Sequence, residues 1–370
     1  MFIYILTIFI LFSGSILEES KGLKKEWIFF LKVIVFFILV LQMGLRWETG
    51  TDWNSYLNHF VEIDNFSSTS PLNNGFEFGY NFFVWLVKLF TNSYSLFLLI
   101  HSFLFYYLLF KSYKYLSSNF YLSILIFYCL FIGLEGSNRQ LLSLVICIYS
   151  LKFLIESKVK YFIFFVGIAT LIHTSSVLFL LYYFFNRKIS GKYLLIMLIL
   201  AFLIGNMGFS NSIFQILGNL LGINSSLKVS TYLEYANSTL ENERLSLIGV
   251  FKRIILLIIF YSLRNKITTH NFTYNLLFNG YFIGLVFYLL FYKSLLIMIS
   301  RGSVFFNAME PLLMSSIIIV LPKNSVKYLY LMLMFVVSIL YFLQSISHYS
   351  DLFIPYKGIF INTELNREMY

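Results

Sequence analysis

The feature that most constrains this chain is a series of apolar stretches, each long enough to cross a lipid bilayer. A membrane-spanning helix needs roughly 17–25 mostly apolar residues, and such windows recur along most of the 370 residues. Charged residues make up 12% of the chain, against about 25% in a soluble domain. Because the stretches are too long and too continuous for barrel strands, the sequence predicts an all-α, polytopic integral membrane protein.

Individual spans can be placed from these windows. The clearest are 2–17, 27–45, 94–110, 119–134, 139–155, 193–207, 246–263, 273–292, 303–321 and 326–344. Residues 78–90 are short and aromatic with Lys88 inside, which favours an interfacial or re-entrant helix. Residues 161–185 are too long for one straight helix, and the sequence His-Thr-Ser-Ser in their middle predicts two short helices. The expected architecture is a bundle of about 10–12 transmembrane helices. The first apolar stretch lacks a preceding basic region, so we expect a retained span rather than a cleaved signal.

The distribution of Lys and Arg predicts which loops face the cytosol. With the N-terminus outside, the short inner loops hold fourteen basic residues and the longer outer segments only nine. Basic residues favour cytosolic loops, so topology explains the net charge of +10 and no nucleic-acid partner is expected. The predicted organisation is a single transmembrane domain, 1–370, with outer loops 46–93 and 207–245.

Six polar residues from five separate stretches fall on or near the predicted outer side. They are Arg46, Asp52, Glu77, Arg139, His173 and Arg301. An active site requires such convergence on one face, whereas a passive scaffold does not.

The sequence GLRWETGTDWNSY, residues 44–56, contains the first two of these residues. Arg46 is a candidate for binding a phosphate or diphosphate by paired hydrogen bonds. Asp52 is a candidate for accepting a proton or orienting a sugar hydroxyl, and Gly50 permits a sharp turn between the two. In the alternative interpretation Arg46 reaches towards the membrane surface, and Tyr56 and the two tryptophans are interface anchors.

Three further candidates lie at predicted helix ends. Glu77 is surrounded by aromatic residues, where a carboxyl has a raised pKa and can act as a base; the alternative is an acid that complements a helix dipole. Arg139 lies in a first helical turn, which disfavours a cation and implies an anionic partner, of which Glu135 is the local alternative. His173 lies at the predicted break beside a helix start; the alternative is a core histidine bonded to backbone.

Lys252 and Arg253 lie about two turns inside a predicted span, and Arg301 lies at the entry of another that contains Glu310. Ionised groups within the membrane are costly and are candidates for function. Adjacent basic residues on a helix cannot point the same way, so at least one should face an anion or a paired acid. A Lys252 side chain that extends to the membrane surface is the alternative.

Several motifs of other protein classes are missing from the sequence. There is no Walker loop, no dinucleotide-binding glycine motif, no HExxH, no Cys/His metal cluster and no Asp-x-Asp pair. Cys129 and Cys147 both lie in apolar runs and are expected in the core. We therefore expect no cofactor and no metal, and a substrate that arrives already activated and lipid-borne.

The order of the polar motifs resembles the EpsG-type branch of the Wzy polysaccharide polymerases. The motifs are GLRWETGTDWNSY, FEFGYN, SNRQLLSLVICIYS, LIHTSSVLFL, SRGSVFFNAMEPLL and IPYK, between residue 44 and about residue 357. The resemblance implies a GT-C-like helical fold in the bacterial cytoplasmic (inner) membrane. It also implies a glycosyltransferase that joins undecaprenyl-diphosphate-linked oligosaccharide units of O-antigen, capsule or exopolysaccharide on the outer face. The donor and the acceptor are then both lipid-linked, and a chain-length regulator and a flippase of the same pathway are possible partners.

The resemblance divides the candidate residues into two roles. Asp52, Glu77 and His173 are the candidates for activating the acceptor hydroxyl. The expected diphosphate- and substrate-binding residues are Arg46, Arg139, Lys252, Arg253, Arg301 and Tyr56. Fixed guanidinium groups would stabilise the charge that develops on a departing diphosphate.

Other functions remain open at this point. An O-antigen ligase would use the same donor with a different acceptor. A flippase of lipid-linked oligosaccharides would show internal repeats, which the sequence lacks. A membrane acyltransferase would take its donor from the cytosol, and a non-enzymatic partner of an export complex would not need six polar sites.

Overall fold

A computed structural model describes residues 1–20, 25–66, 75–207, 212, 216, 247–267, 271–292 and 302–361. In these residues the protein is all-α, with isolated β-bridges in place of named strands. Six described helices are long and apolar enough to cross a membrane. They are Phe2–Ser20, Glu26–Gly44, Tyr94–Leu116, Asn138–Ile155, Phe272–Phe291 and Asn324–Ile346. The predicted all-α, polytopic membrane fold is confirmed.

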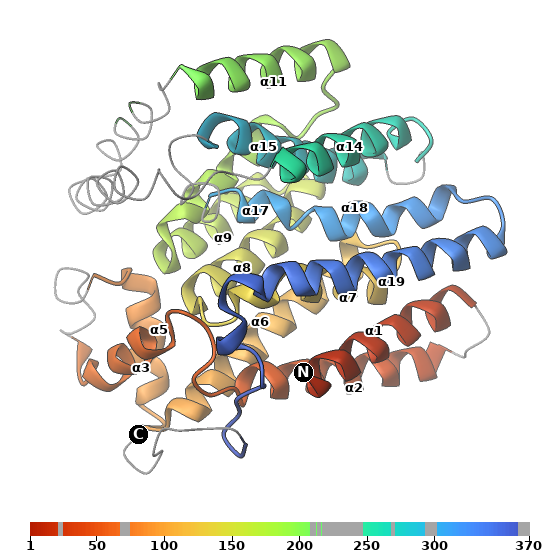
Figure 1. Ribbon diagram of the computed structural model, residues 1–370. Helices are drawn as coiled ribbons and strands as arrows, with labels where there is room; N and C mark the ends of the chain where they lie inside the picture. The colour runs from red at the N-terminus through yellow and green to blue at the C-terminus, as the bar shows by residue number, and fades with distance from the viewer. Residues whose placement is uncertain are drawn as a thin grey trace. The chain divides into compact units, whose positions relative to one another are not determined.

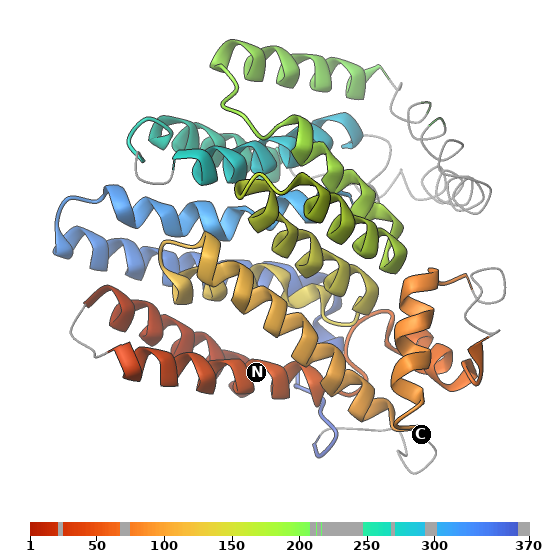
Figure 2. The same cartoon turned by 180° about the vertical axis from the view of Figure 1, so that it is seen from behind.

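The first of two compact units comprises Met1–Val177 and Met314–Tyr370. Its long helices are α1 (Phe2–Ser20), α2 (Lys25–Gly44), α6 (Tyr94–Leu116), α7 (Phe120–Phe131), α8 (Asn138–Ile155), α9 (Val159–Ile172) and α19 (Asn324–Ile346). Helix α6 packs between α2 and α8, and α8 packs on α9 (Figures 1 and 2). Helix α7 packs between α1 and α19 and is almost fully buried, as a helix that is apolar on all sides should be.

Two short helices of the first unit contribute to the candidate site. Helix α3 (Trp53–Glu62) has a polar face and a buried face, and α5 (Phe78–Lys88) has only 11 residues. Neither is long enough to span a bilayer, which agrees with the interfacial or re-entrant helix expected at 78–90. Helix α5 packs against α9 and α6.

The second unit comprises Leu178–Leu313. Its helices are α10 (Leu181–Phe184), α11 (Gly191–Asn206), α14 (Leu247–Leu263), α15 (Asn271–Phe291) and α17 (Val304–Asn307). Helix α15 is central, because α10, α11, α14 and α17 all pack on it. A Cβ on Gly205 would lie 2.2 Å from the Leu289 carbonyl oxygen, so this glycine permits the close approach of α11 to α15.

Two expectations about single spans have different outcomes. The break predicted within 161–185 is confirmed, because α9 ends at Ile172 and the 3-10 helix η3 (Thr174–Leu180) begins directly after His173. The span expected at 303–321 matches an apolar helical run, Val304–Val320, but this run is divided. This stretch contains α17, α18 (Glu310–Ser316) and the 3-10 helix η4 (Ile317–Val320), and Pro311 lies in the first turn of α18, where its missing N–H costs no hydrogen bond. The outer loop expected at 207–245 lies almost wholly outside the described residues.

Candidate active site

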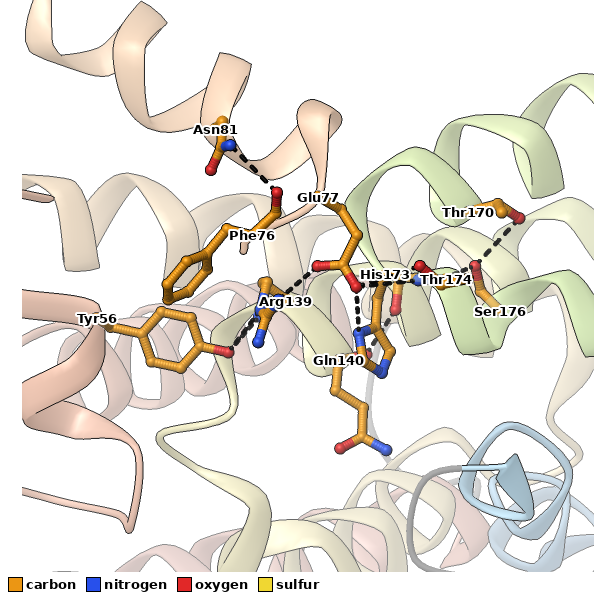
Figure 3. Close-up of polar contacts among 11 residues, drawn as sticks. Tyr56, Phe76, Glu77, Asn81, Arg139, Gln140, Thr170, His173, Thr174 and Ser176 are labelled. Atoms are coloured by element: carbon orange, nitrogen blue, oxygen red, sulfur yellow. Dashed lines mark hydrogen bonds and ion pairs between the residues drawn. The ribbon is translucent and has the colours of Figure 1, made fainter. Parts of the chain in front are cut away.

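The core of the candidate site is an ion pair between Glu77 and Arg139. Nη1 of Arg139 donates to Oε2 of Glu77 at 2.5 Å (Figure 3). The side chains remain 19% and 13% exposed, respectively, so the pair is accessible at one edge. Among the described residues, Nη2 of Arg139 has no hydrogen bond. Nε and Nη1 of the guanidinium are both held by neighbouring side chains.

His173 and Thr174 both contact Oε1, the other oxygen of the Glu77 carboxylate. Nδ1 of His173 is 3.7 Å from Oε1, and Oγ1 of Thr174 donates to the same oxygen at 3.3 Å. The backbone at His173 is extended, with φ −152° and ψ 113°, while its N–H still donates to the last turn of α9. The break between the helices thus directs the imidazole towards Glu77.

Aromatic side chains pack around the Arg139 guanidinium. The Tyr56 hydroxyl accepts from Nε of Arg139 at 3.2 Å, and the Phe76 ring centroid lies 4.3 Å from Cζ. His59 stacks on Phe76 at 3.8 Å. Burial, together with the nearby charge of Arg139, lowers the pKa of His59 to about 4, so this imidazole is neutral near pH 7. The arginine is held in a fixed orientation, as a preorganised anion site requires.

A glycine explains how Glu77 reaches His173. Gly79, in the first turn of α5, lies against the end of α9, where an added Cβ would be 2.8 Å from the carbonyl carbon of Leu171. The two backbones can approach this closely only because Gly79 has no side chain. Since Glu77 precedes Gly79 by two residues and His173 follows Leu171 by two, the contact brings the carboxylate and the imidazole together.

A second glycine contact brings the loop before α3 to the start of α8. Gly50 and Gly136 have φ of 92° and 113°, values that favour glycine. A Cβ on Gly50 would lie 2.8 Å from Cα of Gly136 and 2.2 Å from the Glu135 carbonyl oxygen. The sharp turn expected at Gly50 is present, and it places Tyr56 beside Arg139.

Arg46 is buried beside the residue that precedes Arg139. Its side chain is fully buried, and it donates to the Met43 carbonyl and, at 2.5 Å, to Oδ1 of Asn138. The carbonyl of Asn138 also contacts Nε2 of His101 at 2.9 Å. Arg46 therefore braces the residue that precedes Arg139. Direct binding of a diphosphate by Arg46 stays a prediction, and the geometry favours a supporting role.

Two other acids of this region lie near the cluster. Asp52 is half-buried at the N-terminal boundary of α3 and does not cap the helix with its side chain; its backbone carbonyl accepts from Tyr56. Glu135, the local alternative as partner of Arg139, is buried instead, and its Oε2 has no hydrogen bond among the described residues. Burial raises the pKa of Glu135 to about 7, and the charge of Arg46 opposes the shift.

The remaining candidates belong to the second unit. Nζ of Lys252 lies 3.9 Å from Oε1 of the buried Glu310, so the expectation that one of the adjacent cations faces a paired acid is confirmed. The guanidinium of Arg253 lies 4.3 Å from the Tyr288 ring centroid. Arg301 lies outside the described residues. A role in substrate binding for these three residues stays a prediction.

Several contributors were not identified from the sequence. Phe76 contacts Arg139, Thr174 contacts Glu77, and Asn138 accepts from Arg46. Each of them is the chain neighbour of a predicted site residue, in the sequences FEF, SNR and HTS. This adjacency is the one feature of the sequence that indicates them. In the described part of the chain, no group of three or more His, Cys, Asp or Glu side chains is placed to hold a metal ion.

The fold and the site define a polytopic, all-helical membrane protein with an arginine–glutamate–histidine cluster at the starts of α8 and α5 and the end of α9. A model of the EpsG family matches residues 29–358, and the chain belongs to this family. Membership supports a polysaccharide-polymerase type of function, with glycosyltransferase-like chemistry, for this multi-pass membrane protein. Searches of curated proteins and of solved structures gave no match.

Proposed function

We propose that this protein joins lipid-diphosphate-linked oligosaccharide units, with undecaprenyl diphosphate as the lipid carrier, on the outer face of the bacterial cytoplasmic membrane. The observation that carries the proposal is the cluster of Arg139, Glu77 and His173, which combines an anion-binding arm with a carboxylate–imidazole pair. A transfer from a diphosphate carrier needs both functions. The topology inferred from the basic loops supports the outer face.

Arg139 is assigned to the diphosphate of the donor. One arm of its guanidinium contacts Glu77, and Nη2 has no hydrogen bond among the described residues. A diphosphate carries more negative charge than one carboxylate, so it can bind Nη2 while Nη1 stays bonded to Glu77. As the glycosidic bond breaks, negative charge grows on the diphosphate, and a fixed guanidinium stabilises it.

His173 is assigned to the acceptor. The acceptor hydroxyl oxygen attacks the anomeric carbon of the donor, and the bond from that carbon to the diphosphate breaks with its electron pair on the diphosphate. The hydroxyl proton passes to the imidazole, and the Glu77 carboxylate stabilises the imidazolium from 3.7 Å. Separations of this size often shorten when substrate binds.

Binding of the carrier tests the donor assignment separately from catalysis. Purified protein in nanodiscs is titrated with undecaprenyl diphosphate, and with undecaprenyl monophosphate as the matched ligand. Arg139→Lys keeps the charge but loses the planar, two-armed contact, so it should weaken diphosphate binding about tenfold or more. The exposed Arg187→Lys is the control and should bind as the native protein does. Equal affinity of the native protein and Arg139→Lys would remove the donor site from this cluster.

Sidedness has its own test. Thr51 is exposed, and Cys129 and Cys147 are buried, so a Thr51→Cys variant presents one reactive thiol. A membrane-impermeant maleimide added to intact spheroplasts should label it. Labelling only after the membrane is opened would place the site on the cytosolic side and contradict the proposal.

A further inference from the structure

The segment 353–361 folds back onto the loop that follows α2. The N–H of Trp47 donates to the Lys357 carbonyl at 2.9 Å, and the N–H of Ile359 donates to the Leu45 carbonyl at 2.8 Å. Between these bonds, Arg46 and Gly358 form an antiparallel bridge. The two stretches thus make a short two-stranded contact although more than three hundred residues separate them. We call residues 353–361 the C-terminal strap.

Side chains fix the strap at further points. The Tyr356 hydroxyl donates to the Gln42 carbonyl at 2.8 Å, in the last turn of α2, and Phe353 is buried. Nζ of Lys357 lies 4.0 Å from Oε2 of Glu48. Backbone bonds, a buried hydroxyl and an ion pair therefore all join the strap to residues 42–48.

The loop under the strap supports the candidate active site through Arg46. The buried guanidinium of Arg46 donates to Oδ1 of Asn138, the first residue of α8, and Arg139 follows directly. A cation is unfavourable at a helix N-terminus and costly to bury. Arg46 holds this place because the backbone of its own loop is fixed on both sides, by α2 and by the strap.

We infer that the C-terminal strap is a positioning element for the reaction, which acts through Arg46 and Asn138 on the orientation of Arg139. The inference rests on the proposed function, because it concerns the same cluster. No residue of the strap touches substrate in this account, and Tyr356 is its main positioning residue.

Truncation gives the largest expected effect. Ending the chain after Ile361 keeps the strap, and should leave polymerisation in membranes of the native host unchanged. Ending it after Ile354 removes residues 355–361, which carry the bonds of the strap to residues 42–48, and should lower the rate about 10²-fold, the size expected for a displacement of about 1 Å at a reacting group. Equal polymerisation by the two truncated proteins, at equal protein levels, would overturn the inference.

A milder variant avoids the risk that truncation prevents folding. Tyr356→Phe removes only the hydroxyl that binds the Gln42 carbonyl, and should lower kcat about three- to tenfold with KM unchanged. The exposed Tyr349→Phe is the control. If the strap acts through Asn138, then Tyr356→Phe should cost nothing further in an Asn138→Ala background. Full additivity of the two changes would contradict this route.

A readout independent of substrate separates this inference from the proposed function. Thr49 is fully buried in the loop under the strap. A Thr49→Cys protein with Cys129→Ser and Cys147→Ser should react slowly with maleimide when the chain ends after Ile361. It should react at least tenfold faster when the chain ends after Ile354. Unchanged labelling would refute the positioning role of the strap, even if the protein polymerises. Faster labelling, together with no polymerase activity in the protein that ends after Ile361, would support the role of the strap and refute the proposed function.

Discussion

The backbones of Gly50 and Gly136 are in direct contact, so that a Cβ on Gly50 would lie 2.8 Å from Cα of Gly136. This contact joins the loop that leads to Tyr56 with the loop that leads to Arg139. Its consequence is that the site depends on two residues without side chains.

Gly50→Ala should destabilise the fold and reduce activity. The alanine would adopt an unfavourable φ of 92° and its Cβ would meet the Glu135 carbonyl oxygen at 2.2 Å, at a combined cost of about 2–4 kcal/mol. The apparent melting temperature in detergent measures it. Gly75→Ala is the matched control, because Gly75 has a φ of 70° but open space around its Cβ position. It should cost only about 1–2 kcal/mol, and equal losses would show that the close contact contributes nothing.

A second pair of glycines separates close packing from helix propensity. Gly79→Ala should push α5 away from Leu171 and move Glu77 from His173, and so lower activity more than tenfold. Gly167→Ala, inside α9 with nothing within 4 Å of its Cβ position, should instead stabilise by about 1 kcal/mol with normal activity. Normal polymerisation by Gly79→Ala would argue against the assembly described for the site.

Glu135 should make stability depend on pH. Its pKa is raised from 4.5 to about 7 by burial, so the folded state favours the protonated carboxyl. The contribution of Glu135 to the free energy of unfolding is therefore complete below about pH 4.5 and is lost as the pH rises through about 7. Glu135→Gln stays neutral, so its stability relative to the native protein, followed by the melting temperature, should rise between about pH 4.5 and pH 7 and then stay about 3 kcal/mol higher above pH 7.

The groups that interact with Glu135 are one guanidinium and four tyrosine side chains. They are Arg46, Tyr4, Tyr106, Tyr128 and Tyr356. The exposed Glu62→Gln serves as the control and should follow the native curve. A constant difference between Glu135→Gln and the native protein from pH 5 to about pH 9 would refute the assignment.

Replacing the candidates for the catalytic base should lower kcat by different amounts. Glu77 pairs with Arg139, and an ionised carboxylate in such a pair is a weak proton acceptor. His173→Gln should therefore lower kcat about 10²–10⁴-fold. The Asp52 carboxylate instead accepts from the Thr51 hydroxyl at 3.4 Å, so Asp52→Asn should lower kcat less than about tenfold. The reverse order would make Asp52 the base.

Much of the fold was predictable because it depends on local apolar patterns. The all-α membrane class, the short helix at 78–88 and the break at His173 follow from run length and from polar residues within a run. The stretch 303–321 shows the limit, since run length predicts one span there but does not reveal that α17 ends at Asn307 and α18 begins at Glu310.

The partners of the site residues depend on contacts between distant segments. The dipole argument predicted an anion for Arg139, and the chain neighbour Glu135 was the alternative, yet the partner is Glu77. That choice is made by the approach of Gly79 to Leu171, which involves two helices. Likewise, Arg46 ends a span as an exposed anion binder would, but Asn138 and the C-terminal strap bury it. Single-sequence patterns carry no information on either contact.

The most direct test of the account is polymerisation by Arg139→Lys in membranes of the native host lacking its own copy of the protein. Replacement of the two-armed guanidinium should reduce the polymerisation rate about 10²–10³-fold, so that single lipid-linked repeat units accumulate while the protein level stays normal. Arg187→Lys, in parallel, should give full-length polymer. Polymer of native length and amount from Arg139→Lys would contradict the central claim that this guanidinium binds the leaving diphosphate.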